Sequence, residues 1–192
     1  MSRAEDPRPA RTRAAILAAV ASLSERDDDV TVLSIVAEAG ISRSTFYTQY
    51  RDLDALAVAI LSDAFREVEA LDLSLRQTTS PVETARATTA RLVAEFARRR
   101  SLYAGVLGSR TTTEAHRAVQ DAFAAEALET MRATAPGGVD PEVAADYIAG
   151  GSLAVITAWL LSDEPATTEH VQRQLLALLP SWMLIDERDH TA

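Results

Sequence analysis

The sequence contains neither cysteine nor lysine. Without cysteine the chain forms no disulfide, no thiolate zinc site and no cysteine nucleophile. All 19 basic residues are therefore arginine, and 28 acidic residues oppose them, which gives a formal net charge of -9. A charge of this sign repels nucleic acid from the molecule as a whole, so a DNA-binding surface on this chain has to be local.

The negative charge is concentrated in the later part of the chain. Residues 1–60 carry seven arginines and nine acidic residues, a net charge of -2, whereas residues 61–192 carry 12 arginines and 19 acidic residues, a net charge of -7. Arg8, Arg11 and Arg13 lie close together in the N-terminal arm and at the start of the first expected helix. The first third of the chain is thus the part that nucleic acid can approach.

Several kinds of chemical motif are also missing. The segment AGVLGS has neither the spacing nor the lysine of a phosphate-binding loop. The three histidines, at positions 116, 170 and 190, show no metal-ligand spacing. No nucleophile-elbow motif supports Ser/His/Asp catalysis. We therefore expect no catalytic residues, no metal and no cofactor, although an enzyme built on a helical bundle stays an open alternative.

No uninterrupted apolar stretch has the length of a membrane span. The first residues are polar and contain proline, and the longest apolar stretches, such as SLAVITAWLL, have about half the length that a bilayer requires. We expect a soluble cytoplasmic protein with no membrane partner.

Alanine and leucine dominate the sequence, and no window shows the alternation of a strand. The pattern predicts an all-α protein of about nine helices. The expected helices span 11–26, 31–40, 42–50, 52–75, 81–99, 101–109, 112–133, 140–162 and 167–185.

Residues 31–50 have the spacing of a helix-turn-helix: a short helix, a turn at Gly40 and a second short helix. Gly40 can adopt the positive φ of a sharp turn. Ile41, Phe46 and Tyr50 share the side that faces the core. The outward side carries hydroxyls, Arg43 and Gln49, which are side-chain types that bind phosphates and base edges. We expect DNA contacts from Arg11, Arg13, Thr31, Ser42, Arg43, Ser44, Thr45, Tyr47, Thr48 and Gln49. The alternative is two ordinary core helices with a polar surface.

The segment TVLSIVAEAGISRSTFYTQYRDLDAL resembles the N-terminal domain of TetR-family transcriptional regulators, and the resemblance covers roughly residues 11–60. It implies a three-helix DNA-binding domain at residues 1–56 and a larger helical ligand-binding and dimerisation domain at residues 57–192. Three positions depart from the family pattern: Leu33 and Leu53 stand where basic residues are common, and Gln49 stands where histidine is.

The resemblance also implies a homodimer and a ligand cavity. Two glycines inside the helix at 140–162 each cost about 1 kcal/mol relative to alanine, which close approach of another helix offsets. We expect Tyr147, Gly151, Val155, Leu175, Leu179 and Trp182 at the dimer interface. By resemblance, Phe65, Phe96, Tyr103, Leu107, Phe123 and Trp159 line the cavity for an apolar small-molecule effector. The alternative for the first set is a monomer in which both helices are ordinary core helices. The alternative for the second set is a close-packed core without a cavity.

The function implied is a ligand-responsive regulator, a repressor in its commonest form, that binds double-stranded DNA at a palindromic operator and is released by an inducer. The alternative is a ligand- or protein-binding module of the same fold that no longer binds specific DNA. Leu33 and Leu53 are the residues that favour the alternative.

Overall fold

The computed structural model describes residues 8–26, 28–108 and 113–185. This part of the chain contains helices and no strand, which confirms the all-α prediction. Residues 1–7 and 186–192, the outer ends of the two predicted domains, lie outside the described residues. The elements are α1 (Arg8–Glu25), α2 (Val32–Glu38), α3 (Arg43–Gln49), α4 (Leu53–Arg76), α5 (Pro81–Arg98), α6 (Arg100–Gly108), α7 (Thr113–Thr134), α8 (Pro141–Leu160), α9 (Thr168–Leu178) and the 3-10 helix η1 (Ser181–Met183).

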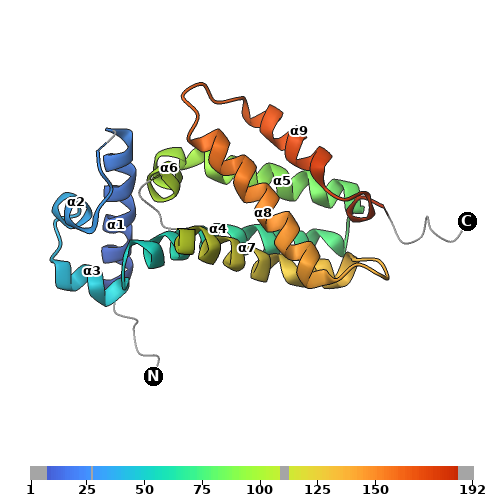
Figure 1. The fold of residues 1–192 in the computed structure, drawn as a ribbon, viewed down its shortest axis with the longest axis horizontal. Coiled ribbons are helices and arrows are strands. Elements are labelled where there is room, and N and C mark those ends of the chain that lie inside the picture. Colours follow the sequence, from blue (N-terminus) through green and yellow to red (C-terminus); the bar gives the residue numbers. More distant parts are fainter. Residues whose placement is uncertain (1–7, 27, 109–112, 186–192) are drawn as a thin grey trace, which may run out of the picture.

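The molecule has a small end and a large end. Helices α1, α2 and α3 group together at one end, and α4 to α9 form the rest (Figure 1). We call α1–α3 the head and α4–η1 the body. Helix α4 begins directly after α3 and runs from the head along the body, where it packs against α5 and α7.

Local sequence explains the helix-turn-helix of the head. Thr31 and Ser34 form a capping box at the start of α2, which satisfies amides that have no partner inside the helix. Gly40 adopts φ 64°, the left-handed conformation that favours glycine, and turns the chain between the helices. The Ser42 side chain then accepts a hydrogen bond from the Thr45 amide and caps α3.

Apolar side chains from all three helices hold the head together. Ile16, Ile35 and Phe46 are fully buried, and Tyr50 is nearly so, with its ring beside that of Phe46. Ile41 packs against the same cluster. The inward positions predicted for α3, the second helix of the helix-turn-helix, are thereby confirmed. The buried side of α3 anchors this helix to the head.

Two sets of contacts fasten the head to the body. Arg13 on α1 pairs with Asp63 on α4 and donates a hydrogen bond to the Tyr50 hydroxyl at 3.2 Å. Helix α6 packs closely against α1, because Gly105 has no side chain: a Cβ there would lie 3.1 Å from both Val20 and Ser24. The head thus contacts the body through both α4 and α6.

The centre of the body is an aromatic stack. The Phe65 ring lies between those of Phe123 (centroids 4.1 Å apart) and Phe96 (6.2 Å), and Phe96 in turn stacks on Tyr103 (4.3 Å). These rings come from α4, α5, α6 and α7, so the stack joins four helices. Stacked aromatic pairs each add about 0.5–1.5 kcal/mol beyond their buried area.

The last helix is shorter than predicted. The sequence pattern suggested a helix over 167–185, but α9 ends at Leu178 and the chain continues into η1. Pro180 is the cause: it has no amide to donate, and it disfavours helical geometry at the preceding residue, so Leu179 is extended at ψ 141°. Leu179 and Trp182 therefore leave the register of α9.

Helix α8 is the one described helix whose length and composition would allow it to cross a membrane. It packs along α7 and also contacts α5, α6 and α9. Its apolar composition is thus used, at least on one side, for packing inside the body.

Candidate DNA-binding surface and effector cavity

The outer side of α3 presents polar side chains. Arg43, Ser44, Tyr47 and Thr48 are exposed, and Tyr47 keeps 54% of its surface accessible. The Tyr47 ring stands edge-on against buried Phe46, at a centroid distance of 5.6 Å. The structure brings these four predicted residues together on one exposed side of the helix and holds the tyrosine in place.

Other predicted contacts have structural roles that occupy them. The hydroxyls of Thr31 and Ser42 accept amide hydrogen bonds as N-caps of α2 and α3, from Ser34 and Thr45 respectively. Thr45 and Gln49 are half-buried. These four residues lie at the edge of the exposed side of α3 and form its border.

The two arginines predicted from the arm differ. Arg11 is exposed on the first turns of α1, whereas Arg13 is partly buried in its bonds to Asp63 and Tyr50. Burial raises the pKa of Tyr50, so the hydroxyl that Arg13 contacts stays protonated at neutral pH. Arg13 is therefore held within the protein, where it positions the head on α4.

The departures from the family pattern are visible in the structure. Leu33 on α2 is 60% exposed, so its apolar side chain lies on the surface of the head. Leu53 packs against the core at the start of α4. Arg51 beside it is exposed and forms an ion pair with Asp52 at 2.8 Å.

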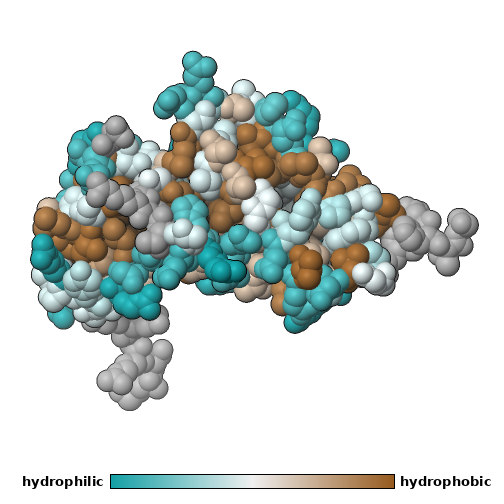
Figure 2. Space-filling view, in the orientation of Figure 1, coloured by the Kyte–Doolittle hydropathy of each residue, from teal (hydrophilic) through white to brown (hydrophobic). Residues whose placement is uncertain are grey.

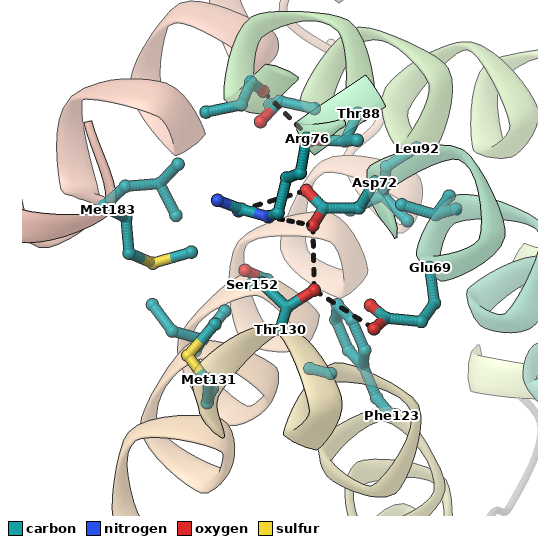
Figure 3. Close-up of a pocket in the computed structure, with 16 residues that line it drawn as sticks. Glu69, Asp72, Arg76, Thr88, Leu92, Phe123, Thr130, Met131, Ser152 and Met183 are labelled. Carbon is teal, nitrogen blue, oxygen red and sulfur yellow. Dashed lines mark hydrogen bonds and ion pairs between the residues drawn. The ribbon is translucent and has the colours of Figure 1, made fainter. Parts of the chain in front are cut away.

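A cavity of about 90 Å³ lies in the body between α4, α5, α7, α8 and the C-terminal segment (Figure 3). Of the six residues predicted to line a pocket, Phe123 alone is among its lining residues. Phe65, Phe96 and Tyr103 form the aromatic stack next to it, and Leu107 lies in the core.

Trp159 also lies away from the cavity. Its indole NH donates to the Ala166 carbonyl, and Arg100 sits over its ring. Phe65, Phe96 and Tyr103 do not line this cavity because their large rings stack on one another in the interior. The wall of the cavity combines apolar side chains, such as Leu92, Met131 and Met183, with polar and charged ones.

A chain of hydrogen bonds crosses one wall of the cavity. Arg76 donates to both oxygens of Asp72, at 2.5 and 3.3 Å, and the Thr130 hydroxyl lies 2.8 Å from Asp72 Oδ2 and 3.0 Å from Glu69 Oε1 (Figure 3). Burial raises the pKa of Glu69 to about 7, and the nearby charge of Asp72 adds to this effect against the opposing hydrogen bond of Thr130.

These polar residues were not predicted, although the sequence contains a signal for them. Phe65, Glu69, Asp72 and Arg76 recur at spacings of four, three and four, so they share one side of α4. A charged group that continues the buried side of a helix indicates either an internal ion pair or a ligand site.

The exposed part of α8 carries a stripe of apolar residues, with Glu142 and Asp146 exposed beside it. Val143 and Tyr147 are 64% and 66% exposed, and Gly151, Ala154, Ala158 and Leu161 continue the line along the helix. Figure 2 shows hydrophobic surface over this part of the body. Nothing lies within 4 Å of a Cβ at Gly151, whereas one at Gly150 would meet Gln120 of α7.

The structure divides the predicted dimer residues. Tyr147 and Gly151 lie on the stripe, Val155 is half-buried beside it, and Trp182 lines a surface groove together with Val143 and Tyr147. Leu175 is buried in the core, so it is not available to a partner. Leu179, shifted by Pro180, lines the cavity instead. Leu178, which was not among the predicted interface residues, is 60% exposed.

In the part of the chain that the structure describes, no group of three or more His, Asp or Glu side chains is arranged to hold a metal ion. The geometry thus consists of a helix-turn-helix head, an internal cavity with a charged wall, and an apolar helix side.

Comparison with known proteins identifies this fold. No protein-family model matches the chain, and no curated protein of similar sequence was found. Solved structures do match. FadR of Thermus thermophilus, a TetR-family transcriptional repressor in complex with lauroyl-CoA, superposes with a TM-score of 0.63 at 20% identity, over 91% of this chain and 96% of that chain.

Two further structures agree. RolR in complex with resorcinol has a TM-score of 0.57 at 24% identity, over 90% of this chain and 89% of that chain. The fatty acid degradation regulator FadR of Bacillus halodurans has a TM-score of 0.61 at 14% identity, over 97% and 99%. The chain therefore has the fold of TetR-family transcriptional regulators, as the resemblance of residues 11–60 implied.

Proposed function

We propose that this protein is a homodimeric, ligand-responsive transcriptional regulator, in its simplest form a repressor, that acts without catalysis in the cytoplasm. The observation that carries the proposal is the exposed side of α3: Arg43, Ser44, Tyr47 and Thr48 project from a short helix that Gly40 and the Phe46 anchor hold at the surface. Such a helix fits the major groove, where arginine pairs with guanine and hydroxyls contact phosphates.

The stripe on α8 supports the homodimer. Exposed apolar surface along a whole helix indicates a partner, and a two-fold axis would pair the stripe with its own copy. Two heads then reach two half-sites about 34–36 Å apart, one turn of DNA, so the operator is a palindrome.

The cavity supports control by a small molecule. Helix α4 lines the cavity with Val68, Glu69 and Asp72, and its first residues adjoin α3. A ligand that favours one position of α4 therefore changes the separation of the two heads, and with it the fit to DNA. RolR with resorcinol and FadR with lauroyl-CoA show that proteins of this fold hold small molecules.

A second candidate function is a binding module of the same fold that does not bind specific DNA. Leu33 favours it, because an exposed leucine replaces a phosphate contact early in α2. The engagement of Arg13 with Asp63 removes another cation from the surface, and the net charge of -9 opposes DNA.

Arg43→Ala and Tyr47→Ala separate the two candidates. Each change is expected to cost about 1–3 kcal/mol of operator binding, measured by fluorescence anisotropy, because the side chain is exposed and its loss leaves the head folded. Arg86→Ala on α5 is the matched control, since it removes an exposed arginine near the start of α5, at the end of the body away from the head (Figure 1). Equal binding by all three variants and the unchanged protein would favour the module without DNA specificity.

A further inference from the structure

The Thr130 hydroxyl lies between two carboxylates but has only one hydrogen. Its oxygen is 3.0 Å from Glu69 Oε1 and 2.8 Å from Asp72 Oδ2, both hydrogen-bonding distances. A hydroxyl donates once, so Thr130 cannot serve both acceptors while both are ionised. A proton on one of the two carboxyl groups, donated to Thr130, resolves this conflict.

That proton belongs to Glu69. Asp72 forms an ion pair with Arg76, which donates hydrogen bonds to both of its oxygens. No cation pairs with Glu69 among the cavity-lining residues: α4 contributes only Asp72 and the Arg76 that Asp72 engages, α7 contributes Thr130 and Phe123, and α5, α8 and η1 add hydroxyl and apolar groups. Along the chain Glu69–Thr130–Asp72–Arg76, each contact between neighbouring side chains is then a hydrogen bond with one donor and one acceptor.

The wall of the cavity is therefore short of one positive charge. Two carboxylates and one guanidinium line it, and the missing charge is supplied by a proton that an incoming cation can replace. The remaining wall suits an apolar body, because Leu92, Met131 and Met183 face the space and the Phe123 ring borders Glu69 (Figure 3). Aromatic faces and methionine adapt to small organic cations.

We propose that the cavity binds a small apolar amine whose ammonium group displaces the proton of Glu69 and forms an ion pair with the resulting carboxylate. The ammonium group keeps its own protons, and the proton of Glu69 passes to water. Thr130 then donates either to Glu69 or to Asp72, with the ammonium group donating to the former. The amine, and not a purely apolar molecule, is the effector class that this wall selects.

This inference deepens the proposed function and rests on it only in treating the cavity as the effector site. The cavity volume of about 90 Å³ is smaller than the engineered cavity of about 150 Å³ that holds benzene. The amine is therefore short and branched, or a longer one that reaches out through the mouth of the cavity.

The test is calorimetric titration of the full chain, without DNA, with isopentylamine, isopentanol and isovalerate. The three probes share a branched apolar group and differ in carrying a cation, a neutral hydroxyl or an anion. At pH 8 we expect the amine to bind about tenfold more tightly than the alcohol, since an ion-paired hydrogen bond exceeds a neutral one. Isovalerate should bind most weakly.

Glu69→Gln should abolish the advantage of the amine, because the glutamine amide can still donate to Thr130 but carries no charge. Glu67→Gln is the control: it makes the same change on the same helix, but at a surface residue that pairs with Arg91, and should leave the preference intact. The inference is overturned if the amine does not bind, if the alcohol or acid binds as tightly, or if the preference survives in Glu69→Gln.

Proton release gives a second readout. At pH 6 the amine should expel about one proton from the unchanged protein, and the alcohol none, as measured from the heats in buffers of different ionisation enthalpy. Amine binding without proton release would contradict the exchange at Glu69. DNA binding is measured separately, so amine binding without a DNA complex would refute the proposed function alone, and an operator complex without amine binding would refute this inference alone.

Discussion

Glu69 is the residue whose chemistry the fold changes most. An exposed glutamate is ionised at neutral pH, but burial beside Asp72 raises the pKa of Glu69 from an ordinary value of 4.5 to about 7. The folded state therefore binds a proton that the unfolded state has already lost between these two pH values. The stability that this proton contributes is present at pH 4.5 and is lost as the pH rises through 7.

Replacing the carboxyl group tests this directly. Glu69→Gln should gain about 1–2 kcal/mol of stability relative to the unchanged protein between pH 5 and pH 8. This is about half of what the full shift implies, since Glu69 is only half-buried and solvent screens its charge. Urea unfolding at the two pH values measures the difference.

Glu67→Gln provides the comparison for this experiment as well. Its carboxylate is exposed, so the pH dependence of unfolding should match that of the unchanged protein. A parallel pH dependence in Glu69→Gln would show that Glu69 is ionised throughout the range.

At the residue scale, helical spacing predicts which side of α3 is buried, but it does not predict contacts between distant segments. Arg43, Ser44, Tyr47 and Thr48 were assigned to the surface because helical spacing places them opposite buried Phe46, and the structure has them exposed. The engagement of Arg13 by Asp63, 50 residues away, depends on how α1 meets α4, which no local pattern contains.

At the scale of elements, the turn between α2 and α3 decides whether the head forms. Gly40 has φ 64°, and nothing lies within 4 Å of a Cβ placed there. The cost of Gly40→Ala is therefore backbone strain and not steric overlap. We expect a loss of about 1–2 kcal/mol, seen as a lower Tm in thermal unfolding.

Gly137 offers a matched comparison in the loop before α8. A Cβ at this position would also have open space around it, but the φ of Gly137 does not lie in the left-handed region. Gly137→Ala should therefore change the Tm little. Equal effects of the two substitutions would mean that the conformation of Gly40 is not required by the turn.

The starts of several helices were predictable because, like the turn at Gly40, they depend on local sequence. The expected helices start at Thr31, Ser42 and Asp52, and these residues are the N-caps of α2, α3 and α4, because their side-chain oxygens accept hydrogen bonds from the first amides. The end of α9 was not foreseen: its apolar pattern continues past Leu178, and only Pro180 interrupts it. That single residue moved Leu179 from the expected interface into the cavity wall.

At the scale of the whole molecule, the α8 stripe is apolar surface that stays exposed in the described part of the chain. Val143→Asp together with Tyr147→Asp should weaken dimerisation by on the order of 3–6 kcal/mol, because two apolar side chains on each protomer would lose their burial and charges would face one another. Analytical ultracentrifugation measures the change, and operator affinity should fall with it.

Ala125→Asp on the exposed side of α7 is the control for added charge, and it should leave the association unchanged. If the double variant stays as dimeric as the unchanged protein, the stripe is not the interface. If Ala125→Asp dissociates equally, general charge repulsion and not the stripe accounts for the effect.

The overall architecture followed from the sequence because helical periodicity and capping residues repeat along the whole chain. The cavity did not, because its position depends on which side chains fill space first. Phe65, Phe96 and Tyr103 were expected around a ligand, yet they stack with one another. The cavity lies beside them and is lined by both apolar and polar side chains.

The central claim is that this acidic chain binds DNA as a dimer through the exposed side of α3. Selection of bound duplexes from a random-sequence library at low salt tests it most directly. The account predicts enrichment of a palindrome whose half-sites are centred about one helical turn apart, bound by the unchanged protein and much more weakly by Arg43→Ala. Recovery of no enriched sequence, or equal binding of the enriched sequence by Arg43→Ala, would contradict it.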